Sequence, residues 1–499
     1  MTKKIKIILW IDADFMTFGM AKSIQEQFDC ELYAIIDITN KGKKFFEEQN
    51  FVNFKKIWYY HDYIKKSNQE PDYDFLSKFE NRHGINLWMI AQNERIFYDF
   101  NNYHKFSTKE ISLILEQECK LFETILKEIQ PNFLITRITD LQHNHIFSLT
   151  CKSFDVKILM LWSTKLGFKS LIVDEINKEL FLTNKLTNEL TLEELQHYQK
   201  ENNSFKKVKQ YQNNNRNSSK DLLKAALSFL LSSFDANKTN YPYYGRTKFK
   251  VIYKEFIARL KRRYREFYIN KFFIKNLLGS KRPIVYFPLH ANMDRVLLIG
   301  APFYTNQIEI IKNIVKSLPI DYELYVKEHP ILRVYGWRKI SFYKELQSIP
   351  RVKLIHPSVN PEIIIKKSSL VISISGTAGL EAAFQDKPSI VLVDQDYSFL
   401  DSVKKINNFS ELPSVIKNMV GKTTDISGLN RYVNYIQKNS FDFDWMNYHL
   451  SVQNKLLYGG NLADTEITLD QMKLFLEEQK QTFDLLAKEH IKKINKYKI

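Results

Sequence analysis

The chain has 499 residues and a formal net charge of +17, and 44% of its residues are hydrophobic. This length is too great for one ordinary domain, and the apolar content is enough for about two or three buried cores. Three cysteines, widely separated, fit neither a disulfide framework nor a metal-ligand spacing. The basic excess favours an anionic partner, such as a nucleic acid, an acidic membrane surface or a phosphorylated substrate.

Residues 1–175 alternate between short apolar strands and helices. The predicted strands are residues 5–11, 31–36, 133–136 and 156–161, and the predicted helices are residues 16–28 and 143–154. Such alternation is typical of parallel βαβ units. The first apolar run is short and soon meets Asp12, so we expect a first strand and no signal peptide. The sequence also has no apolar run of about 18 residues that would span a membrane.

The character of the sequence changes after residue 175. Residues 175–240 contain Asn- and Lys-rich stretches that predict a mobile loop or insertion. Residues 248–278 predict a long helix, because large apolar side chains recur at spacings of three and four. These side chains are Phe249, Tyr253, Phe256, Leu260, Tyr264 and Phe267.

The predicted helix at residues 248–278 is strongly basic. From Arg246 to Arg282 there are 13 basic and 2 acidic residues, a local charge of +11. The helix either lies on an anionic membrane surface, near a lipid-linked acceptor, or is a solvated linker packed through its aromatic face. We expect no nucleic acid as partner, because no nucleic-acid-binding motif accompanies the charge.

A second series of alternating elements begins at residue 283. Its predicted strands are residues 284–289, 322–327, 352–355, 370–375 and 389–393, and its predicted helices are residues 307–317, 361–367 and 378–384. Two such units in one chain indicate an α/β protein of GT-B type, with two Rossmann-like domains facing a cleft. The expected parts are an N-terminal domain (1–175), a polar insertion and basic amphipathic helix (176–280), a C-terminal domain (281–445) and C-terminal helices (446–499).

Polar residues follow the predicted strand at residues 322–327. Ligands of open parallel sheets bind beyond the carboxyl ends of the strands, and here the order is Lys327, Glu328, His329 and Pro330. A histidine in this place can donate a hydrogen bond to a phosphate oxygen, which would favour its charged form. The alternative is a loop histidine without a role, since a second His-Pro pair begins at His356.

A glycine-containing turn follows the predicted strand at residues 370–375. Ser375, Gly376, Thr377 and Gly379 come at the start of a predicted helix, where backbone N–H groups and hydroxyls suit a phosphate. A helix start without a ligand is the alternative. Glu381 lies in the first turn of that helix, where it either holds ribose hydroxyls or complements the helix dipole.

A third polar strand end completes a pattern that resembles a known family. His290 closes the segment FPLH, with Asn292 and Asp294 nearby, and the segments KEHP, HPSVN, SISGTAGLEAA and KPSIVL follow in order. Together they resemble the capsule polysaccharide synthesis family, closely over residues 283–400 and loosely before that.

The resemblance implies a GT-B fold and inverting transfer of a sugar from a CMP-activated donor, notably Kdo. It also implies that His329 and Pro330 contact the nucleotide phosphate and that Ser375, Gly376, Thr377 and Gly379 form the phosphate loop. The sequence departs from the family after the last strand, where only the short segment 394–397 stands in place of a longer Gly/Pro/Tyr-rich stretch.

An inverting transferase needs a carboxylate that accepts the proton of the acceptor hydroxyl. Asp14 and Asp140 are the candidates that we favour, ahead of Asp12, since each follows a predicted strand of the N-terminal domain. The alternative for each is a helix cap or a solvated turn residue.

The sequence thus predicts a cytoplasmic glycosyltransferase, or one peripheral at the inner face of the membrane, that builds a surface polysaccharide. Its expected partners are a nucleotide-sugar donor, bound by the C-terminal domain, and a glycan or lipid-linked glycan acceptor, and we expect no metal and no cofactor. Two rival functions remain: transfer of glycerol or ribitol phosphate from a CDP donor, as in teichoic-acid synthesis, and a non-catalytic role in glycan assembly.

Overall fold

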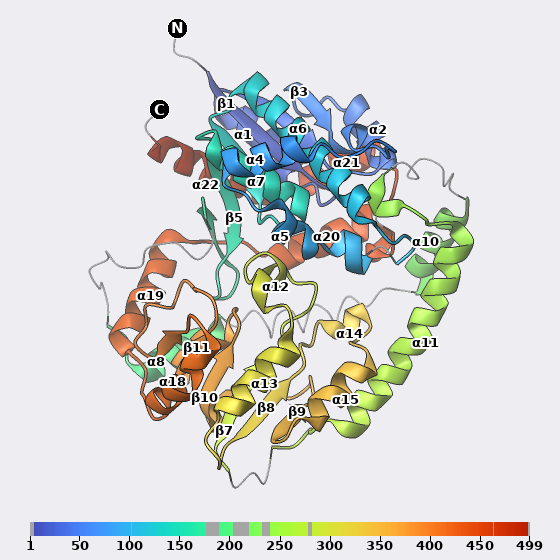
Figure 1. The fold of residues 1–499 in the computed structure, drawn as a ribbon. Helices are drawn as coiled ribbons and strands as arrows, with labels where there is room; N and C mark the ends of the chain where they lie inside the picture. The colour runs from blue at the N-terminus through green and yellow to red at the C-terminus, as the bar shows by residue number, and fades with distance from the viewer. Residues whose placement is uncertain are drawn as a thin grey trace.

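The computed structural model describes residues 4–100, 102–175, 189–202, 219–231, 240–277, 282–462 and 464–497. They form two α/β units, each built on its own sheet, one above the other in Figure 1. The expected α/β fold of GT-B type, with two Rossmann-like domains, is confirmed. Most of the Asn- and Lys-rich stretch expected to be a mobile loop lies outside the described residues.

The first sheet has seven strands in the order β13-β6-β5-β4-β1-β2-β3. β1 to β5 pair in parallel, whereas β6 runs antiparallel to β5, and β13 antiparallel to β6. The strands are β1 (Ile5–Ile11), β2 (Cys30–Ile36), β3 (Phe54–Tyr59), β4 (Phe133–Arg137), β5 (Lys157–Ser163), β6 (Lys169–Val173) and β13 (Phe441–Asp442). β1 (IKIILWI) is almost entirely apolar, because helices cover both faces of a central parallel strand.

Seven α-helices connect the strands of the first sheet. They are α1 (Met16–Gln27), α2 (Asn40–Glu48), α3 (Tyr60–Tyr63), α4 (Tyr73–His83), α5 (Leu87–Gln92), α6 (Thr108–Ile129) and α7 (Gln142–Ser153), with a π-helical turn at Ile96–Phe100. A capping box explains why α6 begins where it does: the Ser107 hydroxyl accepts from the backbone N–H of Glu110, and the Glu110 carboxylate accepts from that of Ser107.

The second sheet has six parallel strands in the order β12-β11-β10-β7-β8-β9. The strands are β7 (Ile284–Pro288), β8 (Glu323–Lys327), β9 (Val352–Ile355), β10 (Ser368–Ser373), β11 (Ser389–Val391) and β12 (Val403–Lys405). The helices are α12 (Arg295–Leu298), α13 (Gln307–Ser317), α14 (Leu332–Tyr335), α15 (Ile340–Ser348), α16 (Pro361–Lys367), α17 (Ala378–Phe384), α18 (Leu412–Met419) and α19 (Ile426–Asn439). Short 3₁₀ turns lie at Pro302–Tyr304 and Phe409–Glu411.

The C-terminal helices return to the first sheet. They are α20 (Trp445–Leu456), α21 (Leu469–Glu478) and α22 (Lys480–Lys496), with a 3₁₀ turn at Tyr458–Gly460 after α20. Phe483 of α22 shares a buried core with Phe18 of α1 and Leu9 of β1. A Cβ on Gly19 would stand 2.3 Å from the Phe483 ring, so glycine allows α1 and α22 to approach this closely.

Among the described residues, the segment of the chain that joins the two sheets holds the helices α8 (Leu192–Glu201), α10 (Ser219–Leu231) and α11 (Lys248–Phe272), the last preceded by a 3₁₀ turn at Tyr241–Tyr243. α11 runs along the outside of the molecule beside both units (Figure 1). Its aromatic stripe faces solvent, with Phe249 81% and Tyr264 66% exposed. The alternative that this helix packs through its aromatic face is therefore wrong. No helix among the described residues is long and apolar enough to cross a membrane.

Candidate functional site

The second sheet has its topological switch point between β7 and β10. From β7 the chain adds β8 and β9 on one side, and then returns to add β10 on the other. Ligands of open α/β sheets bind in the crevice that such a reversal opens. His290 follows β7, and its Nε2 donates to the carbonyl of Ser375 after β10, at 3.0 Å. Two strand ends predicted from the sequence thus meet at the switch point.

The loop after β10 is held by the short segment that departs from the family pattern. Gly376 has φ +88°, a left-handed conformation that favours glycine. Gln395 donates to the Ser375 hydroxyl at 2.8 Å and accepts from the Gly376 N–H at 3.3 Å, and the Tyr397 hydroxyl donates to the Gly376 carbonyl at 2.7 Å. Hydrogen bonds from segment 394–397 therefore hold the loop after β10 in place.

Gly379 and Glu381 of α17 each contact a nearby residue outside the helix. A Cβ on Gly379 would stand 2.8 Å from the Tyr397 hydroxyl, so this glycine is needed for close packing. The Glu381 carboxylate accepts from the Thr377 hydroxyl at 2.6 Å, and burial raises its pKa. The positive charge of Lys327, at the end of β8, partly offsets this rise in the pKa of Glu381.

Lys327 and Glu328 are both buried at the end of β8. Burial lowers the pKa of Lys327 to about 8, although Glu381 opposes the shift. The Glu328 carboxylate accepts from Arg338 Nε at 2.9 Å and from the Tyr343 hydroxyl at 2.8 Å. Both of these groups bond to Oε2, and the backbone N–H of His329 donates to Oε1 at 2.7 Å. Glu328 was predicted to bind the donor, and in the structure protein groups occupy both of its oxygens.

Arg338 is a structural residue that the sequence analysis missed. Besides Glu328, it donates to the carbonyl of His290 and to the amide oxygen of Asn292. It thus ties the end of β7 to the end of β8. Arg338 follows α14 in an irregular segment that matches no motif, so no sequence signal identified it.

The two His-Pro pairs differ in their surroundings. His329 Nδ1 accepts from the backbone N–H of Ile331 at 3.3 Å, and burial lowers its pKa to about 4. The ring is therefore neutral at pH 7 with its proton on Nε2, which can donate. Pro330 continues that turn. His356 follows the edge strand β9, and its Nδ1 lies 2.6 Å from the Ser358 hydroxyl in a local turn.

The first sheet has its own switch point between β1 and β4. Asp12 and Asp14 follow β1, and Arg137 ends β4; its guanidinium lies 2.5 Å from Asp12 and 2.8 Å from Asp14. The Asp14 carboxylate also accepts from the backbone N–H of Met16 at 2.9 Å. Burial raises the pKa of Asp14 against the attraction of Arg137.

Asp140 lies apart from that pair, at the contact between the two units. Its side chain is 46% exposed, 3.6 Å from Arg95. Arg295 of α12 donates from Nε to the carbonyl of the adjacent Thr139 at 2.6 Å, and Arg95 donates to the carbonyl of Met293 at 2.7 Å. The loops after β4 and β7 therefore touch, and they bring Asp140 to the C-terminal unit.

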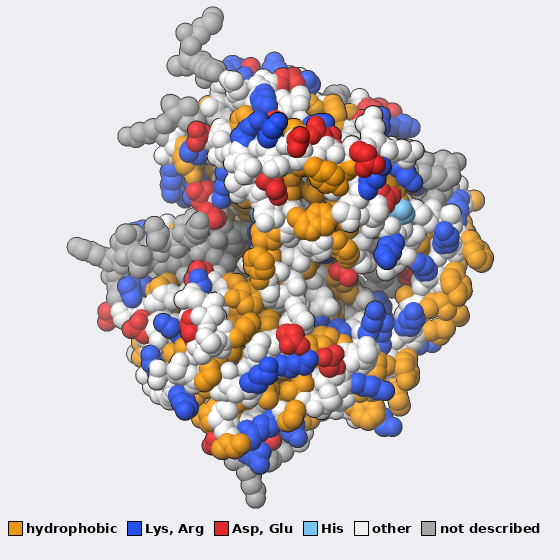
Figure 2. Space-filling view, in the orientation of Figure 1, with side chains coloured by type: hydrophobic (Ala, Val, Ile, Leu, Met, Phe, Trp, Pro, Cys, Tyr) orange, Lys and Arg blue, Asp and Glu red, His pale blue; other side chains and the backbone are white. Residues whose placement is uncertain are grey.

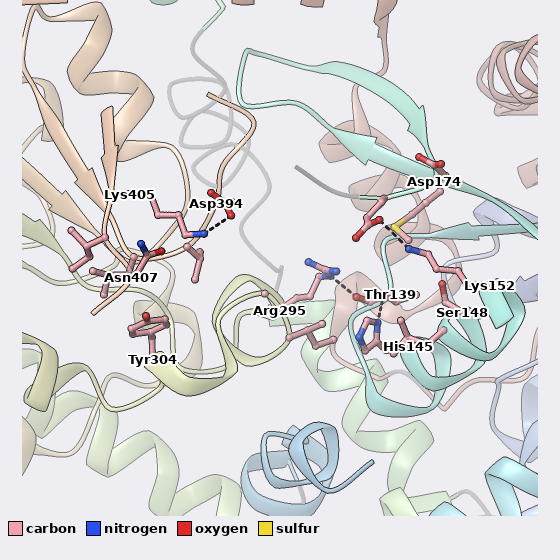
Figure 3. A pocket seen from close by; sticks show the side chains of 18 residues that line it. Thr139, His145, Ser148, Lys152, Asp174, Arg295, Tyr304, Asp394, Lys405 and Asn407 are labelled. Carbon is pink, nitrogen blue, oxygen red and sulfur yellow. Dashed lines mark hydrogen bonds and ion pairs between the residues drawn. The ribbon is translucent and has the colours of Figure 1, made fainter. Parts of the chain in front are cut away.

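A cavity of about 610 Å³ lies between the two units, beside this contact (Figure 3). Its N-terminal wall includes Thr139, His145 and Lys152, and its C-terminal wall includes Arg295, Asp394 and Asn407. The cleft expected between the domains is thus present. None of the predicted donor residues or predicted bases lines this cavity.

A second polar cluster lies at the carboxyl ends of β2 and β3. Asp37 directly follows β2, and its carboxylate lies 2.8 Å from His143 Nε2 and 3.2 Å from His61 Nε2. Asp37 raises the pKa of His143 to about 9 against the effect of burial. The strand-end rule could have found Asp37, whereas His61 follows β3, which the sequence analysis did not predict.

Comparisons with known proteins agree with the motif pattern. The model of a family described as "Capsule polysaccharide biosynthesis protein" matches residues 197–400, so the resemblance is confirmed over that part of the chain. No curated protein matches the sequence.

The similar solved structures include nucleotide-sugar enzymes. UDP-GlcNAc 2-epimerase from Methanocaldococcus jannaschii is 15% identical, covering 87% of this chain and 100% of that one, with a TM-score of 0.25. KpsC from Thermosulfurimonas dismutans matches as a β Kdo 2,4 transferase (12% identity, 60% and 78% covered, TM-score 0.31) and as a β Kdo 2,7 transferase (14%, 70% and 97%, TM-score 0.30). At such TM-scores these matches describe a loose likeness only.

Proposed function

We propose that this protein is a glycosyltransferase of capsule polysaccharide biosynthesis that binds a nucleotide-activated sugar at the β7/β10 switch point. The proposal rests on one observation above all: His290 bonds to the loop after β10, while Lys327 and His329 lie buried at the end of β8, the strand next to β7. The family match over residues 197–400, which includes these strands, supports it.

The chemistry of these groups suits a sugar phosphate. Lys327 is desolvated, so a phosphate oxygen beside it would be attracted more strongly than in water. The Nε2–H of His329 can donate to the same phosphate. Both interactions strengthen as the nucleotide phosphate leaves with the electron pair of the broken glycosidic bond.

We further propose inversion, with Asp140 as the base. The acceptor oxygen would form a bond to the anomeric carbon while the bond to the nucleotide phosphate breaks, and the hydroxyl proton would pass to the carboxylate. Two features support Asp140 over Asp14: its exposure and its place at the contact between the units. Asp14 is engaged by Arg137 and by the start of α1.

A CMP-linked, Kdo-like sugar is the donor that we propose, from the resemblance to the capsule family. Transfer of glycerol or ribitol phosphate from a CDP donor is the rival, and product analysis separates the two. The first reaction yields a glycosidic bond and the second a phosphodiester. A non-catalytic assembly partner would form neither product.

We also propose that α11 holds the protein at an anionic membrane surface. Its exposed stripe and its basic side chains meet along one edge of the molecule (Figure 2). The stripe residues are Phe249, Tyr253, Phe256, Leu260, Tyr264 and Phe267, each between 48% and 81% exposed. Each basic residue near such a surface contributes about 1 kcal/mol. Sedimentation with anionic vesicles should fall steeply as salt rises, and binding to neutral vesicles at equal strength would contradict the proposal.

The nucleotide proposal is tested by thermal shift on the full chain with CMP, CDP, UDP and GDP. We expect CMP or CDP to raise the melting temperature most. His329→Ala should weaken the best nucleotide about 10- to 100-fold, the loss of a hydrogen bond to a charged phosphate. His356→Ala is the matched control, since that histidine belongs to a local turn. Equal effects of both substitutions, or no shift with any nucleotide, would refute the proposed site.

A further inference from the structure

A cavity of about 910 Å³ opens beside the carboxyl ends of β2 and β3 in the N-terminal unit. Its walls come from the start of α2, from the segment around His61, and from segment 240–250, which leads into α11. No residue assigned above to the nucleotide or to the base lines it.

The cavity wall is basic. Lys65, Lys66, Arg246 and Lys250 line it, whereas Asp62 is its one carboxylate among the described lining residues. The Asp62 carboxylate already lies 2.6 Å from the Lys43 ammonium. A cavity with such an excess of positive charge favours an anionic ligand.

His61 adds a buried, directional group to this wall. Its side chain is 10% exposed, and Nε2 lies 3.2 Å from the Asp37 carboxylate, which His143 holds from the other side. The remaining ring nitrogen, Nδ1, is buried and has no hydrogen-bond partner among the described residues. Because Nε2 donates to Asp37, Nδ1 offers a lone pair that can accept a hydrogen bond from a hydroxyl of the ligand.

Tyr243 and Tyr244 supply an aromatic part of the same wall. Ligand sites commonly combine aromatic surface with a few placed polar groups. Arg246 stacks on Tyr243, with its guanidinium carbon 4.9 Å from the ring centroid, and is thereby held at the wall.

We infer that this cavity binds the acceptor glycan through an anionic group, either a carboxylate of an acidic sugar or a phosphate. The inference builds on the proposed transferase function. The cavity lies at the carboxyl edge of the first sheet, the edge at which open parallel sheets bind ligands, and the donor is assigned above to the other sheet. Its wall continues into α11, the helix proposed to meet the membrane, from which a lipid-linked acceptor would reach it.

The test measures the binding of two probes to the full chain by titration calorimetry: glucuronate for the sugar acid and inorganic phosphate for the phosphate group. We expect saturable binding of at least one probe, and the stronger probe names the acceptor group. Lys65→Ala/Lys66→Ala should weaken it roughly ten-fold or more, since two cations that face the anion are lost. The control, Lys55→Ala/Lys78→Ala, removes the same charge from exposed positions outside the cavity of the same unit.

A further variant, His61→Ala, should weaken the same probe while nucleotide binding stays unchanged. Equal losses in the two lysine pairs, or no binding of either probe, would overturn the inference. The rise in melting temperature with CMP or CDP, measured on the same variants, distinguishes failure of the acceptor cavity from failure of the donor site. If nucleotide binds and neither probe does, the cavity inference fails alone; if a probe binds as expected and no nucleotide does, the donor proposal fails instead.

Discussion

Glu328→Gln tests whether Glu328 braces the donor crevice or touches the donor itself. The side chains of Glu328 and Arg338 are 0% and 3% exposed, and their charged atoms lie 2.9 Å apart. The substitution preserves the shape of the side chain and removes its charge. It therefore leaves the Arg338 guanidinium buried without its counter-ion.

Breaking a buried pair in this way costs about 3–5 kcal/mol. That is a large part of the roughly 5–15 kcal/mol by which a domain is stable. Because Arg338 also holds the carbonyl of His290, the loss should loosen the end of β7. Nucleotide affinity should then fall as a consequence of lost order at the strand ends.

Urea unfolding of the full chain measures the effect, with tryptophan fluorescence as the signal, since Trp337 is buried beside Arg338. The control is Glu362→Gln, whose carboxylate lies 2.9 Å from Lys366 in an i,i+4 pair at the surface of the same unit, with side chains 29% and 50% exposed. That change should cost at most about 0.5 kcal/mol. If Glu328→Gln leaves stability unchanged and still abolishes nucleotide binding, the carboxylate contacts the donor, and the bracing role is refuted.

Three further predictions concern the crevice and the base. Burial lowers the pKa of Lys327 to about 8 in the free protein, and a bound phosphate would raise it, so nucleotide affinity should fall up to tenfold per pH unit as the pH rises above about 8. Nucleotide titrations at several pH values above and below 8 measure this change. Lys327→Arg stays charged over the same range, so its nucleotide affinity should not fall. Gly379→Ala should lower stability by about 1–3 kcal/mol in denaturant unfolding, because its Cβ would overlap the Tyr397 hydroxyl; an unchanged midpoint would contradict the packing role. Asp140→Asn should lose turnover by about 10²–10⁴ with an unchanged melting temperature and donor affinity, whereas Asp14→Asn should keep most of its turnover; the reverse pattern would make Asp14 the base.

Local pattern was enough to predict most elements of the second sheet. The ranges of α13, α16 and α17 and of β9 agree with the predicted ones, because each has a clear apolar period and a turn at both ends. The strand-end rule predicted His290 and the loop after β10 at the same edge of the sheet, and the structure shows them in contact.

The sequence alone determined the α/β class, the motif order of the capsule family and the basic, amphipathic character of residues 248–272. Only the tertiary structure decided which faces of these elements are buried and which are exposed to solvent. An aromatic stripe has the same period whether it is buried or exposed, so the period did not reveal that Phe249 and Tyr264 face solvent. Likewise, Arg338 pairs with Glu328 across a loop, and His61 with Asp37 across two strands. No regular sequence spacing marks such pairs, because the fold of the chain brings the two residues together.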